Sequence, residues 1–228
     1  MTEVSFLAAS DPSLFTYFLL SNFAGKIIIF LLGLGSILAW TVMIAKGYEL
    51  KRIRRGNLRF EKSLNRDSPL VEIDVKSMKT RRNPYATLVV AAVQAFYRWE
   101  GPESEGHPKQ MNQVENALQR VIAKQTVAYE SKMVMMASIV TGAPFLGLLG
   151  TVWGVMDAFG GVALAGSATI QSLAPGVSGA LLTTVAGLLV AIPSVFGYNY
   201  LLSQIRNLTM ELENFASSVA DRIELEIR

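Results

Sequence analysis

Two long stretches without a charged side chain occupy the second half of this chain. No Asp, Glu, Lys or Arg lies between Lys132 and Asp157, and none lies from Ala158 to Ile205. The hydrocarbon core of a bilayer is about 30 Å thick, and a helix needs about 20 apolar residues to cross it. The second stretch is too long for one span, so the sequence predicts a membrane hairpin with spans over 133–159 and 176–202 and a turn over 160–175.

A third uncharged stretch, Ile27–Ala45, lies near the N-terminus between two lysines. It is long enough to cross a bilayer and predicts a first span over 26–46. The preceding segment, 1–25, contains two acidic residues and no basic one, whereas a cleaved signal peptide begins with a basic region. We therefore expect this span to be retained.

The positions of Lys and Arg predict how the spans are oriented. Of the 21 Lys and Arg residues, 17 fall from Lys46 to Lys132, and none falls in 1–25. Loops rich in Lys and Arg stay on the cytoplasmic side of a membrane. We expect an all-α protein with three spans, N-terminus outside and C-terminus inside, with a cytoplasmic helical domain over 47–132, a periplasmic segment over 1–25 and a cytoplasmic helical tail over 203–228.

The cytoplasmic segments show helical spacing of apolar residues. One helix is expected to continue from the first span to about Leu64, a second to cover 84–99, and a third to start near Lys109 and run unbroken into the second span. The tail repeats apolar residues every three to four positions, at Leu208, Leu212, Phe215, Val219, Ile223 and Ile227. Its apolar stripe predicts packing within the chain or between subunits, in a helical bundle.

Several classes of function find no support in the sequence. The chain has no cysteine, and His107, its only histidine, has no companion ligand, so we expect neither a metal nor another cofactor. No nucleophile, base and acid set or phosphate loop is present, which argues against an enzyme. The basic cluster after the first span is typical of a membrane flank, so we expect contact with membrane lipids and no nucleic acid; it comprises Lys51, Arg52, Arg54, Arg55 and Arg59.

Small residues dominate the predicted hairpin. Gly150 and Gly154 form a GxxxG pair, and Gly187 with Ala191 forms a similar pair in the third span. Small residues let helix backbones approach closely in a bilayer, which favours tight helix packing and oligomerisation.

Threonine hydroxyls are the repeated polar groups at depth. Thr151 lies near the middle of the second span, and Thr183 and Thr184 lie in the third. Two interpretations stay open. The hydroxyls line a polar pathway, or each bonds to the carbonyl three or four residues earlier in its own helix.

The strings GLLGTVWGVMDAF and LAPGVSGALLTTVAGLLVAIPSVFGYN, in this order, resemble the TolQ/ExbB branch of the MotA/TolQ/ExbB proton-channel family. The three predicted spans, the large first cytoplasmic loop and the helical tail agree with that family. The resemblance implies a homopentamer in the bacterial inner membrane, with a pore that holds a dimer of a TolR/ExbD-like single-span partner. Protons would pass by way of a membrane aspartate of that partner and drive mechanical work on the cell envelope.

The resemblance also implies roles for individual residues. Thr151 and Thr184 match the family threonines that face the partner's aspartate, and Thr183 lies beside them in the sequence. Structural roles in the pore helices are implied for a second set: Pro144, Gly150, Gly154, Pro175, Gly187, Pro193, Tyr198 and Asn199.

The sequence departs from the family at Gly179, where TolQ and ExbB usually carry a glutamate. Asp157 is the one acidic residue of the hairpin. It either replaces that glutamate as an ion or partner contact, or it touches water or caps a helix at the outer interface.

The resemblance leaves the role within the family open. A flagellar MotA-type role is disfavoured because that type has four spans. The tail ELENFASSVADRIE favours a Tol-type role, with ExbB-like energising of outer-membrane transport as the alternative. A scaffold or transporter subunit that conducts no ions is a further alternative.

Overall fold

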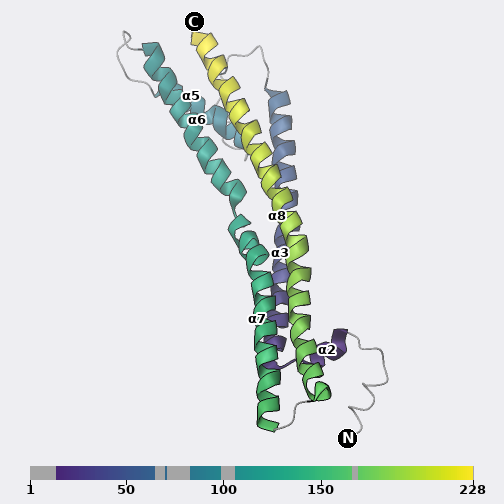
Figure 1. The fold of residues 1–228 in the computed structure, drawn as a ribbon. Coiled ribbons are helices and arrows are strands. Elements are labelled where there is room, and N and C mark those ends of the chain that lie inside the picture. Colours follow the sequence, from purple (N-terminus) through teal and green to yellow (C-terminus); the bar gives the residue numbers. More distant parts are fainter. Residues whose placement is uncertain (1–13, 65–69, 71–82, 99–105, 166–168, 228) are drawn as a thin grey trace. The chain divides into compact units, whose positions relative to one another are not determined.

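A computed structural model describes residues 14–64, 70, 83–98, 106–165 and 169–227 (Figure 1). Every regular element in these ranges is a helix, which confirms the all-α prediction. The helices are α2 (Leu14–Leu20), α3 (Phe23–Ser63), α5 (Pro84–Tyr97), α6 (Gly106–Glu130), α7 (Met133–Ala165) and α8 (Ile170–Ile227).

Three helical stretches are long and apolar enough to cross a membrane. They are Phe23–Ser63, Pro108–Leu164 and Ile170–Glu226, and their most apolar windows have mean hydropathies of 2.5, 1.8 and 2.0. Each contains one of the spans predicted from the sequence. The chain therefore has the composition and the helix lengths of a multi-pass membrane protein.

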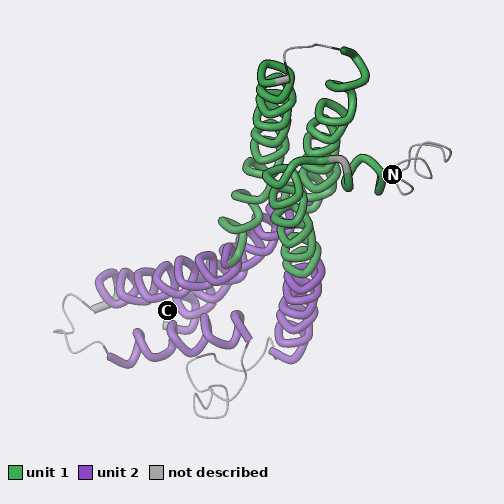
Figure 2. Tube along the Cα trace, turned by 90° about the horizontal axis from the view of Figure 1, so that it is seen from below, with its two compact units in different colours: residues 1–43, 132–199 green, residues 44–131, 200–228 purple. Residues whose placement is uncertain are grey.

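The chain divides into two compact units, which Figure 2 shows in different colours. Unit 1 comprises residues 1–43 and 132–199, and unit 2 comprises residues 44–131 and 200–228. Helices α3 and α8 contribute residues to both units.

In unit 1, α3 packs against α7 and α8 through aliphatic side chains. Ile28 and Leu32 of α3 form one buried cluster with Ala143 and Ala191. A second cluster joins Ala39 and Val42 of α3 to Met136 of α7. These contacts hold α3 against the hairpin of α7 and α8.

In unit 2, aromatic rings join three helices. Tyr85 of α5 stacks on Phe215 of α8, with 3.8 Å between ring centroids, and Phe60 of α3 meets Phe215 edge to face at 6.5 Å. Five of the six residues of the predicted apolar stripe are buried, which confirms that this part of the stripe packs within the chain: Leu208, Leu212, Phe215, Val219 and Ile223. The side chain of the sixth, Ile227, lies outside the described part of the structure.

Polar contacts surround the rings of unit 2. The Tyr85 hydroxyl donates to the carbonyl of Glu211 at 3.1 Å, and Arg54 pairs with the Glu211 carboxylate at 2.7 Å. Burial raises the pKa of Tyr85 to about 12, with further contributions from the negative charges of Glu61 and Glu211. Tyr85 is therefore neutral at every physiological pH.

The expected unbroken helix into the second span is interrupted. α6 ends at Glu130 and α7 begins at Met133, and Lys132 between them has a φ of 69°. The prediction of a continuous helix was therefore wrong. No Gly or Pro occurs at the break. However, the end of α6 is hydrogen-bonded to a side chain of α3: the buried Lys46 donates from Nζ to the carbonyl of Ala128 at 3.3 Å and to Ser131 Oγ at 3.1 Å.

The turn expected over 160–175 is also shorter than predicted. α7 continues to Ala165, and α8 begins at Ile170. Pro175 lies inside α8 rather than before it. The segment 160–175 contains no charged residue that would mark the end of a span, so its composition does not show where the two helices end.

Candidate ion-pathway site

Helices α7 and α8 of unit 1 lie side by side, and glycines of α7 bring their backbones together (Figure 1). A Cβ placed on Gly154 would lie 2.6 Å from the Cβ of Ala180, and one on Gly147 would lie 2.9 Å from the carbonyl oxygen of Thr183. A Cβ on Gly150 would collide with the Thr183 side chain. No side chain larger than hydrogen fits at these positions without moving α8.

Gly187 makes the matching contact from α8. A Cβ at this position would lie 2.7 Å from the carbonyl oxygen of Ala143. The sequence pattern correctly predicted close helix packing. However, the close approach of Gly150, Gly154 and Gly187 is made within one chain, so these glycines are not by themselves a sign of oligomerisation.

The carbonyl of Gly147 is shared by three threonine hydroxyls. Thr183 Oγ1 donates to it at 2.9 Å and Thr184 Oγ1 at 3.2 Å, with a longer contact of 3.4 Å from Thr151 Oγ1. The hydroxyls of Thr151 and Thr184 also bond to each other at 3.1 Å. The structure thus brings all three predicted threonines to one point, where α7 faces α8.

The three threonines differ in exposure. Thr183 is fully buried between α7 and α8, whereas Thr151 and Thr184 keep part of their surface exposed. A hydroxyl enclosed inside one chain is not available to a pathway between chains, so the position of Thr183 fits a packing role rather than the expected pathway role.

Two of the three threonine hydroxyls are satisfied within their own helix. Thr151 Oγ1 donates to the carbonyl of Leu148 at 2.8 Å, and Thr183 Oγ1 donates to that of Ala180 at 2.6 Å, as expected for hydroxyls satisfied in their own helix. Thr184 differs, because its hydroxyl bonds only across to α7 among the described contacts.

Gly147 is the site residue that the sequence analysis did not single out. Its role is carried by a backbone carbonyl, which no side-chain pattern reveals. The available signal was its spacing of three residues before Gly150 and four before Thr151.

Asp157 is hydrogen-bonded to the residue before the first turn of α3. Asn22 Nδ2 donates to Asp157 Oδ2 at 3.3 Å, and Asn22 Oδ1 accepts from the backbone N–H of Gly25 at 2.8 Å. Asn22 is thus the N-cap of α3, and a carboxylate beside a helix N-terminus is favoured by the helix dipole. The geometry supports the interpretation of Asp157 as an exposed capping contact.

The remaining predicted residues lie in or beside the helix packing. Pro144 is inside α7 and Pro193 inside α8, where Ser194 Oγ donates to the carbonyl of Val190 at 2.7 Å. Tyr198 packs against the cluster of Ala39, Val42 and Met136, whereas Asn199 is exposed.

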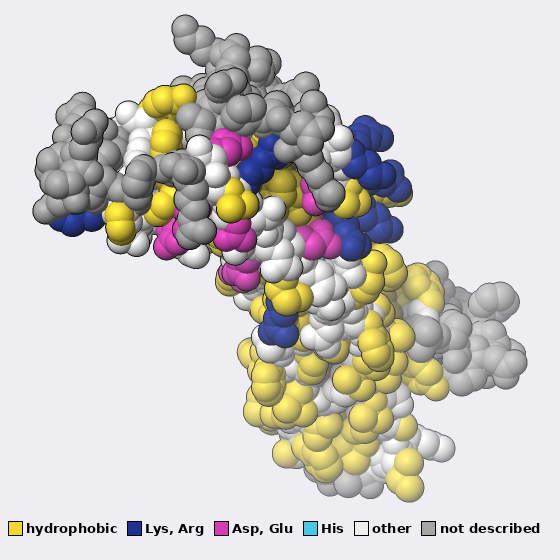
Figure 3. Space-filling view, turned by 90° about the horizontal axis from the view of Figure 1, so that it is seen from above, with side chains coloured by type: hydrophobic (Ala, Val, Ile, Leu, Met, Phe, Trp, Pro, Cys, Tyr) yellow, Lys and Arg dark blue, Asp and Glu magenta, His cyan; other side chains and the backbone are white. Residues whose placement is uncertain are grey.

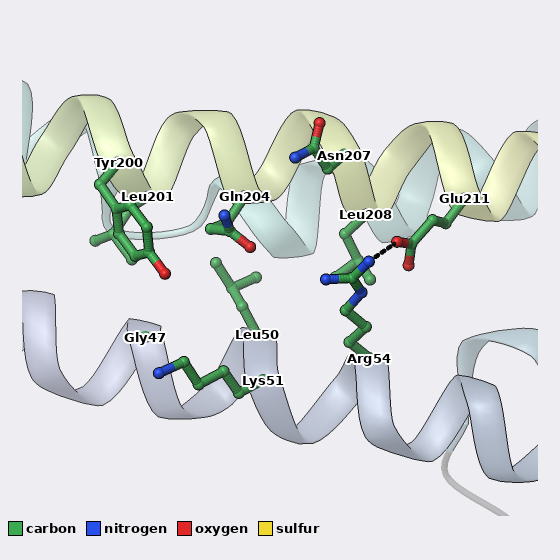
Figure 4. A pocket seen from close by; sticks show the side chains of 10 residues that line it. All are labelled: Gly47, Leu50, Lys51, Arg54, Tyr200, Leu201, Gln204, Asn207, Leu208 and Glu211. Carbon is green, nitrogen blue, oxygen red and sulfur yellow. Dashed lines mark ion pairs between the residues drawn. The ribbon is translucent and has the colours of Figure 1, made fainter.

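A separate polar hollow lies within unit 2, between α3 and α8 (Figure 4). Arg54 from α3 points toward Glu211 of α8 and pairs with it, and Gln204 and Asn207 add amide groups to the same wall. The charges of Arg54 and Glu211 neutralise each other, and Lys51 and Tyr200 also line this hollow.

Residues 82–214 match the model of the MotA/TolQ/ExbB proton channel family. This match covers more than half of the chain. The chain belongs to the MotA/TolQ/ExbB proton channel family.

Relatives within the family carry two different names. The chain is 32% identical over 197 residues to a biopolymer transport protein ExbB of Pseudomonas putida, covering 85% of this chain and 58% of that protein. It is 29% identical over 195 residues to an ExbB of Neisseria meningitidis serogroup A, covering 82% and 86%. A Tol-Pal system protein TolQ of Haemophilus influenzae is 25% identical over 201 residues, covering 87% and 88%.

These relatives support the TolQ/ExbB branch of the family. The chain spans little more than half the length of the Pseudomonas putida ExbB and most of the length of the Neisseria meningitidis ExbB and the Haemophilus influenzae TolQ. The resemblance seen in the sequence is therefore confirmed at the level of family and branch.

The departure from the family pattern at Gly179 has a physical explanation. A Cβ here would lie 2.8 Å from the Cα and 3.1 Å from the backbone nitrogen of Ser21. Ser21, between α2 and α3, is buried against this position. The expected family glutamate would need space that the Ser21 backbone occupies in this chain.

Proposed function

We propose that this chain is the channel-forming subunit of a proton-driven stator in the bacterial inner membrane. With a TolR/ExbD-like partner, it would convert the proton-motive force into mechanical work on the cell envelope. Membership of the proton channel family supports the general activity. The observation that carries the assignment to residues is the partly exposed hydroxyl pair of Thr151 and Thr184 beside the Gly147 carbonyl.

A hydroxyl pair suits contact with a membrane carboxyl group. Each threonine hydroxyl can donate one hydrogen bond and accept two, so the pair can bond a carboxyl group in either protonation state. A fixed charge at the same depth would cost several kcal/mol unless it were paired. Thr151 and Thr184 therefore supply polar contact without a charge that would hold the proton carrier in place.

The assembly that we propose is a homopentamer, N-terminus outside and C-terminus inside, around a dimer of the single-span partner. One proton that crosses 100 mV releases about 2.3 kcal/mol, so a few protons supply the energy of a protein-interface rearrangement. The long apolar faces of α7 and α8 give such an assembly its contact surface, since Phe145, Val152 and Leu189 are exposed in the single chain.

Within the family we propose a Tol-type role, on the resemblance of the tail. Among these three relatives, each matched over more than four fifths of the chain, the identities to the ExbB proteins of Pseudomonas putida and Neisseria meningitidis are higher than the identity to TolQ, which favours an Exb-type role as a second candidate. Complementation of strains that lack either system separates the two, because rescue of envelope integrity identifies the first and rescue of outer-membrane transport the second.

The proposal is tested by proton flux into liposomes that contain the chain with its partner. Thr151→Val and Thr184→Val remove the paired hydroxyls with little change in shape, and we expect each to lower the flux at least tenfold. Thr141→Val is the matched control, because Thr141 lies on α7 like Thr151 and, in the described structure, bonds only to carbonyls of its own helix, at Ala137 and Ser138.

Native mass spectrometry of the same samples reports assembly. Five copies of the chain with two of the partner, in wild type and variants alike, would assign the loss of flux to the pathway itself. Unchanged flux in both Thr151→Val and Thr184→Val would contradict the proposal and favour a scaffold that conducts no ions.

A further inference from the structure

One face of α3 carries an aromatic ring and three arginines in register. Tyr48, Arg52, Arg55 and Arg59 follow at intervals of four, three and four residues, which places them on one side of a helix with 3.6 residues per turn. All four side chains are exposed. Lys and Arg side chains gather in a patch on the face drawn in Figure 3.

This face is hollowed rather than flat. The four residues line a hollow of about 870 Å³ together with Lys51 and with the start of α5. Gly56 allows the close approach of α5, because a Cβ on it would lie 3.2 Å from Asn83 Nδ2. The hollow has the size of a small-ligand site, and Asn83 adds an amide to its basic wall.

Within the described part of the chain, the arginines of this hollow have no acidic partner. Among the described residues no carboxylate pairs with Arg52, Arg55 or Arg59, whereas Arg54 on another side of the helix pairs with Glu211 at 2.7 Å. Of the described residues that line the hollow, Glu49 is the one acidic residue, and Lys46 pairs with it at 3.1 Å. The described lining of the hollow therefore carries an excess of positive charge. Its guanidinium groups can donate paired hydrogen bonds to a phosphate group.

The hollow begins where the first membrane span ends. Tyr48 follows the last residue of the uncharged stretch Ile27–Ala45 by three positions, about 4.5 Å along the helix. Tyrosine is enriched at the level of lipid headgroups, where its ring and hydroxyl meet both environments, and Tyr48 is 73% exposed. Arg52 lies one turn further on, and the long side chains of arginines reach back toward the membrane surface.

We propose that this hollow, formed by Tyr48, Lys51, Arg52, Arg55 and Asn83, binds the headgroup of an anionic phospholipid of the same membrane. The phosphate lies between Arg52 and Arg55, Asn83 bonds to the polar end of the headgroup, and Tyr48 lies beside the acyl ester region. This site goes beyond general attraction of basic loops to a membrane, because it requires particular side chains. It does not depend on ion conduction.

The test is native mass spectrometry of the purified chain in detergent, titrated with phosphatidylglycerol or with phosphatidylcholine of the same acyl chains. We expect the wild type to retain phosphatidylglycerol preferentially. Arg52→Gln with Arg55→Gln should weaken this retention at least tenfold, since each basic residue near a membrane surface contributes about fivefold to anionic-lipid affinity. Arg52→Lys with Arg55→Lys keeps the positive charge but not the planar guanidinium groups that donate paired hydrogen bonds to phosphate, and it should give an intermediate loss of lipid retention.

The matched control removes two exposed arginines of a different hollow in unit 2, as Arg98→Gln with Arg120→Gln. It should retain phosphatidylglycerol like the wild type. Equal losses in both double variants would overturn the site, because net charge alone would then explain binding. Equal retention of both lipids, displacement of the lipid by the same concentration of inorganic phosphate, or preferential binding of an RNA oligonucleotide would each overturn it as well.

Discussion

In unit 1, α8 meets its neighbour through glycine, alanine and threonine, whereas in unit 2 the same helix is packed by leucine, valine and aromatic rings. The transfer of apolar surface from lipid to protein contributes little free energy, so helices in a bilayer associate through close backbone approach and hydrogen bonds. Where charged residues mark contact with water, burial of large apolar side chains drives packing instead. One helix thus shows both solutions along its length.

The largest effect on the packing of α8 in unit 1 is expected from a substitution at Gly147. Gly147→Val places new atoms within 3.0 Å of the α8 backbone, which cannot yield as a flexible side chain does. We expect α7 and α8 to separate, with loss of folded protein in detergent or a large fall in its thermal midpoint.

Gly142→Val is the control on the same helix, because nothing lies within 4 Å of a Cβ at Gly142. A similar loss in both variants would show that valine disturbs α7 itself and would remove the packing explanation.

In unit 2, the largest effect is expected at the aromatic cluster. Phe215→Ala removes the ring that stacks on Tyr85 and meets Phe60, and we expect a loss of about 3–5 kcal/mol in the free energy of unfolding. Chemical denaturation followed by the fluorescence of the tyrosines measures it. Leu225→Ala, at an exposed position of α8, should change little.

The junction at the end of α6 gives a third test. Lys46→Met leaves the Ala128 carbonyl and Ser131 Oγ without the ammonium that bonds them, and we expect a loss of about 1–3 kcal/mol. Hydrogen exchange should become faster in the last turn of α6. Lys51→Met, at an exposed position on α3, should leave that exchange unchanged; faster exchange in both would assign the effect to lost charge.

The smallest effect concerns alkaline pH. The pKa of Tyr85 is raised to about 12 in the folded chain from an ordinary value of 10, so the folded state keeps its proton where the unfolded state loses it. This contribution to stability is complete below pH 10 and is lost as the pH rises from 10 to 12. Tyr85→Phe should flatten this part of the stability profile, and an unchanged slope would show that other groups cause it.

The helices themselves were largely predictable from the sequence. The spacing of apolar residues located the end of α3 near Leu64, the extent of α5 and the amphipathic tail of α8, because helix periodicity and the placement of charges are local signals. The break at Lys132 was not predictable by the same means, since the side chain that bonds to the end of α6, Lys46, lies 86 positions earlier, in a different helix.

The candidate site was predictable only in part. Family resemblance pointed to Thr151, Thr183 and Thr184, but neighbouring threonines on a helix face directions about 100° apart, and only tertiary packing shows which of the two stays exposed. The same holds for Gly179, whose lack of a side chain is explained by contact with Ser21 in a distant segment.

The Gly147 carbonyl has a consequence for the protons around it. A carbonyl oxygen has two lone pairs, but three hydroxyl groups lie within 3.4 Å of this one, and each hydroxyl has a single hydrogen. At any instant at least one hydrogen must turn to another acceptor, such as the neighbouring hydroxyl. The same heavy-atom framework therefore admits several hydrogen arrangements, as in ice, and the direction of the hydrogen bonds can reverse while the backbone stays still.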